Sequence, residues 1–181
     1  KIYEGSRNVS EKIKLKEETM SVSTNNKYLI FVLETERYGI PIAKVQEVIS
    51  YVPITSLHET SESFLKGVIN LRGRIIPIID MRLKFALPEK DYTERTIFII
   101  VEIVTTKDLY HVGLVVDAVQ DVVEISEDKI EKTPEVGFKL KNRYLQGLIQ
   151  LQDTMVMILN LDNILATDEV VELAEKIEIN V

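Results

Sequence analysis

An eight-residue stretch occurs twice in this chain, as Phe64-Leu65-Lys66-Gly67-Val68-Ile69-Asn70-Leu71 and, eighty residues later, as Tyr144-Leu145-Gln146-Gly147-Leu148-Ile149-Gln150-Leu151. Each copy is followed by a polar turn and a second apolar run, at residues 75–80 and 155–160. A second element recurs as well, because residues 38–49 and 112–123 keep a Gly, a Val, a Gln, an acid and a Val in place. Such a repeat indicates one structural plan used twice. We therefore expect two halves of about five strands, each too small to bury much core alone.

Short runs rich in Ile and Val, separated by charged pairs and Gly, begin at Tyr28. Runs of about five to eight such residues predict β-strands. The clearest predicted strands are residues 28–34, 38–43, 67–71, 75–80, 96–104, 109–116, 122–125, 144–151 and 155–160. Polar segments at residues 34–37, 72–74 and 152–154 predict hairpin turns between them. Their spacing favours a mainly β fold, a tandem of two small barrels in one compact unit.

The two ends of the chain differ from this pattern. Residues 1–27 carry six basic and four acidic residues and few apolar ones, which predicts a flexible tail, since a short helix near Ser10 would be marginal in water. Residues 28–166 form the predicted β domain. Residues 167–181 form a C-terminal helix and tail. This helix begins at Thr167, and its apolar stripe of Val170, Leu173 or Ala174, and Ile177 is expected to dock on the domain.

Two prolines distinguish the halves. Pro41 and Pro77 lie inside predicted strands of the first half, where the second half has Val115 and Met157. A strand proline cannot donate a hydrogen bond to a neighbouring strand, so it is confined to edges and bulges. We therefore expect the first half to expose a strand edge or a bent face that can serve as a docking surface.

Composition excludes several classes of function. The 181 residues carry 22 Lys and Arg against 29 Asp and Glu, a formal net charge of −7, which repels phosphate backbones and argues against nucleic acid as a partner. The chain has no Cys, no Trp and only two His, His58 and His111. Zinc sites and His-activated nucleophiles therefore lack their usual residues. No apolar run approaches the roughly 18 residues of a membrane span, which predicts a cytoplasmic protein without direct membrane insertion.

The remaining motifs favour ordinary structural roles. The acidic residues between Asp117 and Asp128 do not have the spacing of a Ca²⁺ loop, so a solvated acidic face is the preferred interpretation. Arg72-Gly73-Arg74 is read as a hairpin turn rather than a phosphate site, and both histidines as structural or solvent-facing. We therefore expect no catalytic residues, no metal site and no cofactor, and predict a protein-binding module. A small-molecule or nucleotide enzyme remains the alternative from another class.

Several of these segments together resemble a known family. The segments that carry the resemblance are Tyr38-Gly39-Ile40, Lys44-Val45-Gln46-Glu47-Val48, Phe64 to Asp80 with its Gly67-Val68-x-Asn70-Leu71-Arg72-Gly73 block, Gly113 to Val119, and Tyr144-x-x-Gly147. Together they are similar to the CheW family of chemotaxis coupling proteins. The resemblance runs from about Tyr28 to about Glu175. It implies two SH3-like five-stranded β-barrels, short helical turns and no catalytic activity. It also implies an adaptor that ties the regulatory domain of the histidine kinase CheA to the cytoplasmic tips of methyl-accepting chemotaxis receptors in membrane-associated arrays.

The resemblance also implies site residues. The kinase-binding face would comprise Val45, Val48 and Ile54, although core packing is an equally weighted role for the two valines. The receptor-binding groove would comprise Glu47, Arg72, Ile97, Phe98, Gly113 and Val119, with Glu47 and Arg72 as a charged pair. A second kinase contact, which closes rings of adaptor and kinase in the family, would comprise Glu131, Val136 and Phe138. Val136 stands where some relatives have an aromatic residue, and Phe138 is the nearest substitute.

One related reading stays open from the sequence. A CheW-like regulatory domain from a chemotaxis histidine kinase, or the equivalent module of a CheV-type protein, would carry the same motifs. The full open reading frame would distinguish these from a separate adaptor.

Overall fold

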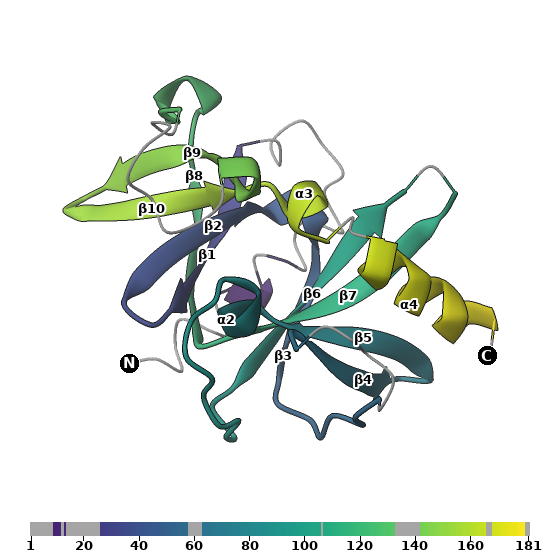
Figure 1. The fold of residues 1–181 in the computed structure, drawn as a ribbon. Helices are drawn as coiled ribbons and strands as arrows, with labels where there is room; N and C mark the ends of the chain where they lie inside the picture. The colour runs from purple at the N-terminus through teal and green to yellow at the C-terminus, as the bar shows by residue number, and fades with distance from the viewer. Residues whose placement is uncertain are drawn as a thin grey trace.

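The computed structural model describes residues 9–11, 13, 26–57, 63–105, 107–132, 142–165 and 168–179. Within them, ten strands form two five-stranded sheets (Figure 1). Sheet A contains β1 (Lys27–Leu33), β2 (Glu36–Pro41), β8 (Ala118–Glu124), β9 (Leu145–Leu151) and β10 (Thr154–Leu159), in the order β8-β1-β2-β10-β9. Sheet B contains β3 (Val45–Ser50), β4 (Leu65–Leu71), β5 (Arg74–Asp80), β6 (Ile97–Val104) and β7 (Leu109–Val116), in the order β3-β6-β7-β5-β4. The predicted mainly β fold with two five-stranded units is confirmed.

The two halves of the repeat do not form one sheet each. Sheet A combines the β1–β2 hairpin of the first half with β8, β9 and β10 of the second, and sheet B combines the β6–β7 hairpin with β3, β4 and β5. The exchange is made by two equivalent parallel pairs, β2 with β10 and β7 with β5, whereas the other pairs within the sheets are antiparallel. Each half therefore completes the sheet of the other, so the chain is more intertwined than the expected tandem.

In each sheet, the segment beyond one outer strand bridges to the other outer strand. Beyond β3, Thr55 exchanges backbone hydrogen bonds with Val68 on β4, both 2.9 Å long. Beyond β8, Glu131 exchanges backbone hydrogen bonds with Leu148 on β9, both 2.8 Å long. The two bridges occupy the same place in the repeat, and they give each sheet the curvature of a small barrel.

The repeated glycines lie where backbones approach most closely. A Cβ at position 67 would stand 2.0 Å from the Thr55 carbonyl oxygen, and one at position 147 would stand 2.5 Å from the Glu131 carbonyl oxygen. Only glycine permits these bridges, because real Cβ atoms do not approach backbone atoms so closely.

The interior consists of three apolar clusters. One contains buried residues of sheet A alone, such as Ile30, Val156 and Ile158, and another contains residues of sheet B alone, such as Ile78, Phe98 and Ile100. The largest, which we call the interface cluster, takes residues from both sheets, among them Phe31 and Leu114. Burial of apolar surface between the sheets therefore holds the two units together.

Short α-helices follow one strand of each sheet. α2 (Met81–Lys84) follows β5 and α3 (Leu161–Leu165) follows β10, at equivalent places in the repeat. The Asp80 carboxylate accepts from the backbone N–H of Arg82 at 2.9 Å, and the Asn160 side-chain oxygen accepts from that of Asn163 at 3.1 Å. These short side-chain oxygens cap the first turn of each helix. Short 3₁₀ turns lie at Ile42–Lys44 (η2), Glu127–Lys129 (η3) and Asn142–Tyr144 (η4).

The C-terminal helix α4 (Asp168–Ile179) lies against β5 (Figure 1). Val170 and Ala174 are buried, and Leu173 and Ile177 are half-buried. The predicted docking stripe is therefore confirmed, while its expected cap, Thr167, lies outside the described residues.

The N-terminal segment makes one contact that its polar composition did not suggest. Val9 and Ile13 are helical and are only 1% and 3% exposed, as members of the interface cluster. Two apolar residues four apart share one face of a helix, and Figure 1 shows this turn beside α2. At these two positions the chain packs on the domain, in contrast to the mobile tail that we expected.

Candidate interaction surfaces

Glu47 and Arg72 form an ion pair that joins two parts of sheet B. A guanidinium nitrogen of Arg72, in the β4–β5 turn, donates to a carboxylate oxygen of Glu47 on β3. The turn is fixed by Asn70, whose side-chain oxygen accepts from the Gly73 N–H at 2.9 Å. The Arg72 side chain is 70% exposed and that of Glu47 is 25% exposed. An exposed pair of this kind adds under about 1 kcal/mol to stability, so its charges remain available to a partner.

The other predicted receptor-groove residues differ in how deeply they are buried. Ile97, at the start of β6, is half-buried. Phe98 is fully buried in the cluster of sheet B, Gly113 is buried beside Ile78, and Val119 is only 6% exposed. A partner that docks on the surface would therefore meet Glu47, Arg72 and Ile97 directly. Phe98 and Gly113 lie within sheet B, whereas Val119 lies on β8 of sheet A, and a partner cannot reach any of the three without unpacking the core.

The residues of the predicted kinase face also divide into a buried one and half-buried ones. Val45 is 1% exposed and belongs to the interface cluster, which favours the core role that we weighed for it. Val48 and Ile54 are half-buried, and Ile54 directly precedes the Thr55–Val68 bridge. The accessible part of this face is thus the edge at which sheet B closes.

The predicted second contact lies at the matching edge of sheet A. Glu131 is exposed, and its backbone forms the bridge to Leu148. Val136 and Phe138 lie outside the described residues. Glu131 therefore makes in sheet A the kind of bridge that Thr55, next to Ile54, makes in sheet B.

A buried polar network at the junction of the sheets was missed by the sequence reading. Arg82 on α2 is 6% exposed and pairs with Asp117 at 2.6 Å and with Glu34. The Glu34 N–H also donates to Asp117 at 2.7 Å. Asp117 was expected on a solvated acidic face, but it lies between β7 and β8, where the chain passes from sheet B to sheet A. Its only signal in the sequence is that it interrupts an apolar run.

The same junction holds a buried carboxyl group. Asp80 is fully buried and accepts from the Tyr92 hydroxyl at 2.6 Å. Burial and this acceptor raise the pKa of Tyr92 above its ordinary value. The network is fully hydrogen-bonded, which is the condition under which buried charge is tolerated.

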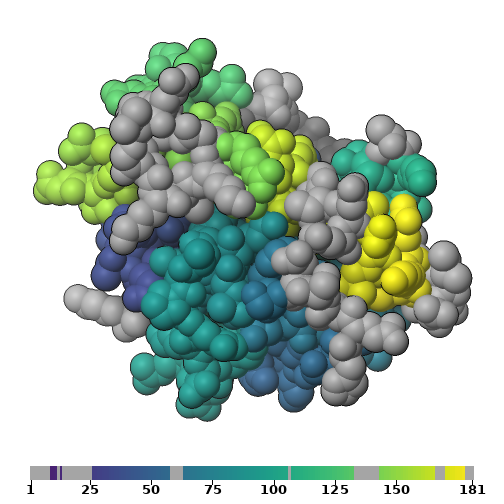
Figure 2. Space-filling model, in the orientation of Figure 1, coloured from purple at the N-terminus to yellow at the C-terminus, as the bar shows by residue number. Residues whose placement is uncertain are grey.

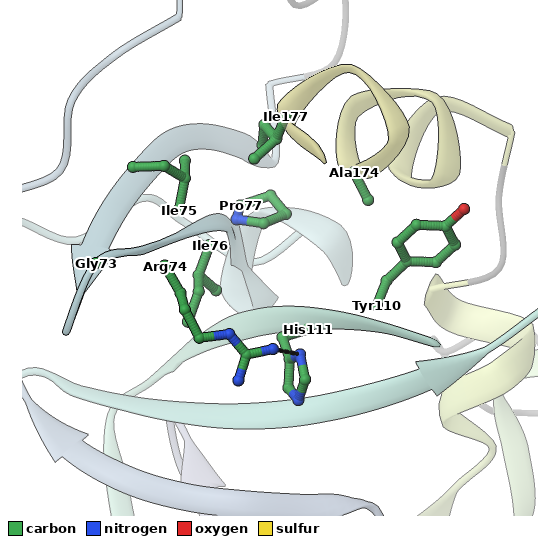
Figure 3. A pocket seen from close by; sticks show the side chains of 9 residues that line it. All are labelled: Gly73, Arg74, Ile75, Ile76, Pro77, Tyr110, His111, Ala174 and Ile177. Atoms are coloured by element: carbon green, nitrogen blue, oxygen red, sulfur yellow. Dashed lines mark hydrogen bonds between the residues drawn. The ribbon is translucent and has the colours of Figure 1, made fainter. Parts of the chain in front are cut away.

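A hollow of about 270 Å³ lies between α4 and sheet B, lined by Gly73, Arg74, Ile75, Ile76, Pro77, Tyr110, His111, Ala174 and Ile177 (Figure 3). Arg74 donates to Nδ1 of His111 at 2.5 Å, so the proton of the neutral ring is on Nε2, which is 3.7 Å from a Glu102 carboxylate oxygen. Burial and the Arg74 charge lower the pKa of His111. His111 is thus a neutral structural residue at one side of the hollow.

Among the described residues, no group of three His, Asp or Glu side chains is placed to hold a metal ion. None of the helices in the described part of the chain is long and apolar enough to span a bilayer.

Comparisons with known proteins agree with this geometry. Residues 27–169 match the family model described as "CheW-like domain". The chain is 39% identical to the chemotaxis protein CheW of Klebsiella aerogenes over 147 residues, which are 81% of this chain and 86% of that protein. It is 29% identical to the chemotaxis protein CheW of Bacillus subtilis, over 81% of this chain and 91% of that protein.

A solved structure supports the same assignment. The crystal structure of the scaffolding protein TtCheW from Thermoanaerobacter tengcongensis is similar with a TM-score of 0.69 and 36% identity, and covers 80% of this chain and 90% of that one. The family match, the relatives and the shared fold all agree with the motifs in the repeat. The chain therefore belongs to the CheW family and is a chemotaxis adaptor.

Proposed function

We propose that this chain couples the histidine kinase CheA to methyl-accepting chemotaxis receptors within membrane-associated arrays, and that it acts by binding rather than by catalysis. The observation that carries the proposal is the exposed Arg72–Glu47 pair, which links the β4–β5 turn of sheet B to β3, the strand that also carries Val45 and Val48. Charges on a protein surface contribute more to partner choice than to fold stability.

The kinase side of the proposal rests on the closing edge of sheet B. Half-buried Ile54 directly precedes the Thr55–Val68 bridge, and half-buried Val48 lies on the outer strand β3. We propose that their exposed apolar surface contacts the regulatory domain of CheA. Val45 supports this edge from the core. Glu131, with Val136 and Phe138, is proposed as the contact to a second kinase through the equivalent edge of sheet A.

The receptor side rests on Glu47, Arg72 and Ile97, supported by Phe98, Gly113 and Val119. A receptor tip is helical, and a helix that docks there would present apolar residues at i, i+3, i+4 and i+7. Signalling is then a shift in the kinase equilibrium by contacts whose affinity differs between receptor states. Individual contacts can be weak, because an array multiplies them.

The test is a pull-down with the CheA regulatory domain and a receptor signalling fragment from the same organism. The Arg72→Glu variant should lose receptor capture by about tenfold or more, equivalent to about 1.4 kcal/mol, and keep its capture of the kinase domain. The melting temperature should change by less than about 2 °C, because the pair is exposed.

A matched control is the Lys66→Glu variant, which reverses the charge of another exposed pair, Lys66 with Glu89 at 2.6 Å. It should leave capture of both partners unchanged. Unchanged receptor capture by the Arg72→Glu variant, or its unfolding, would argue against the receptor role. Loss of binding to both partners by the wild-type chain would overturn the coupling function itself.

A further inference from the structure

The hollow between α4 and sheet B has firm walls. Val170 and Ala174 hold α4 on the domain as buried side chains, and the Tyr110 hydroxyl on β7 donates to a Glu175 carboxylate oxygen at 3.4 Å. Figure 2 shows α4 in yellow at the molecular surface, so the helix forms the outer wall of the hollow and sheet B forms its floor. The volume of about 270 Å³ is therefore present in the folded chain without rearrangement, as is usual for sites that bind small molecules.

Most of the lining is apolar. Figure 3 shows Ala174 and Ile177 of α4 next to Pro77 and Tyr110 of sheet B, with Ile75 beside them. A buried water needs two to four polar partners, and the carbon atoms of these side chains offer none. Water therefore fills this part of the hollow poorly, whereas an apolar molecule would be stabilised there by leaving the solvent.

One end of the hollow is polar and rich in hydrogen-bond donors. Arg74 and His111 lie there side by side, and a guanidinium nitrogen of Arg74 donates to Nδ1 of His111 at 2.5 Å (Figure 3). A guanidinium group carries five N–H donors, so this contact holds the Arg74 side chain in place and leaves donors for a further acceptor. Among the described residues, the buried Nε2 of His111 has no hydrogen-bond partner either. The polar end therefore suits a ligand with an acceptor oxygen.

The charges around the hollow favour an uncharged ligand. Arg74 supplies a positive charge, but a Glu102 carboxylate oxygen lies 3.7 Å from Nε2 of His111, and a Glu175 carboxylate lies at the Tyr110 hydroxyl. An anion would meet these carboxylates, and a cation would meet the guanidinium group. A neutral carbonyl oxygen can accept a hydrogen bond from Arg74 without either repulsion.

The size of the hollow limits the size of its ligand. An apolar cavity of about 150 Å³ binds benzene, so about 270 Å³ holds a molecule of about ten non-hydrogen atoms. A helix with its side chains is about 10–12 Å across, which excludes a helical protein segment. Gly73, in the β4–β5 turn, also lines the hollow and has open space around it, so an entrance lies at this turn.

We propose that the hollow between α4 and sheet B is a binding site for a small uncharged molecule with an apolar ring and one acceptor oxygen. The ring lies between Ala174, Ile177 and Pro77, and the oxygen accepts a hydrogen bond from Arg74. This goes beyond the proposed coupling function, because no residue proposed for the kinase or the receptor lines the hollow.

The experiment uses the full chain and acetophenone, an uncharged aryl ketone of matching size. The methyl resonances of Ala174 and Ile177 in NMR spectra should shift and saturate, with a dissociation constant of about 1 mM or tighter. Benzoate and benzylamine are similar in size but carry opposite charges, and each should bind at least about threefold more weakly. Arg74→Met keeps a long side chain without its donors and should weaken acetophenone binding by at least about threefold.

Two substitutions should fill the hollow. Ala174→Leu, followed by the Ile177 methyl resonance, and Ile177→Phe, followed by that of Ala174, should each weaken acetophenone binding by at least about tenfold. Neither should lower the melting temperature by more than about 2 °C, because each fills empty space. The matched control is Glu172→Gln on the exposed side of α4, which should bind acetophenone within about twofold of wild type.

Methyl resonances of the wild-type chain that do not saturate would overturn the proposal. So would unchanged acetophenone binding by a filled variant that stays folded. Equal or tighter binding of benzoate or benzylamine would overturn the uncharged class of ligand. None of these measurements depends on binding to the kinase or the receptor, so the coupling function would be unaffected.

Discussion

Gly67 and Gly147 bring two backbones closer than a side chain allows, and the effect of replacing them can be separated from that of backbone strain. Gly147→Ala should lower the free energy of unfolding by about 3 kcal/mol, because its Cβ would stand 2.5 Å from the Glu131 carbonyl oxygen. Gly73→Ala is the matched control, since Gly73 has a φ of +83° but open space around it, and it should cost about 1 kcal/mol. Urea denaturation measures both. Equal losses would show that the close approach at Glu131 is unimportant.

His111 makes stability depend on pH in a defined direction. Its pKa in the folded protein lies below the ordinary value of 6.5, so the unfolded chain takes up the proton first as the pH falls. The stabilisation from neutral His111 is therefore complete above about pH 6.5 and is lost as the pH falls toward the folded pKa. The urea midpoint of wild type should fall more between about pH 7.5 and pH 5 than that of His111→Gln. Parallel pH profiles for the two proteins would contradict this.

At the scale of elements, α2 acts as a link between the sheets through Arg82. Removal of one partner from a buried charge network leaves the others without compensation. Arg82→Met should therefore lower the free energy of unfolding by about 3 kcal/mol, because Asp117 and Glu34 lose their shared cation. The loss of unfolding free energy for Arg82→Lys should lie between zero and that for Arg82→Met, since an ammonium group keeps the charge but cannot reproduce the guanidinium fork. Calorimetric unfolding would measure these changes.

The control for this element is Arg95→Met, an exposed arginine in the segment between α2 and β6. It should change stability by less than about 0.5 kcal/mol. If Arg82→Met were equally mild, the network would not join the elements.

The strands show what local sequence can and cannot predict. β7 was predicted at its observed bounds because its apolar run is long and ends at charged or polar residues. β3 was missed as a strand: the bulge between Val45 and Glu47 breaks the alternation, so that Val45, Val48 and Ile49 have helix-like spacing. The Arg72–Glu47 pair followed only from the family resemblance, since the two residues are far apart in sequence. No local sequence pattern indicated that Arg82 belongs to a buried network, because its partners come from other elements.

At the scale of the whole molecule, the exchanged hairpins make the halves interdependent, which the repeat alone could not reveal. A fragment of residues 1–92 contains β1 to β5 but lacks the strands that complete either sheet. We expect it, and residues 93–181, to show no cooperative unfolding alone, because each leaves strand edges and apolar faces exposed. Mixed in equal amounts, the fragments should regain the circular dichroism spectrum of the full chain. A cooperative transition for either fragment alone would contradict this dependence.

The same exchange of hairpins bears on how two halves with one structural plan come to have different functions. A half-length ancestor with this plan could complete its sheets only with a second copy, as an obligate symmetric dimer with two identical faces. Fusion into one chain removes that symmetry and lets each face change by itself. The present chain carries the trace, because Glu47 and Arg72 of the first half correspond to Asp121 and Gln152 of the second. A neutral amide cannot reproduce the ion pair, so the charged pair of the first half has no counterpart at these two positions of the second.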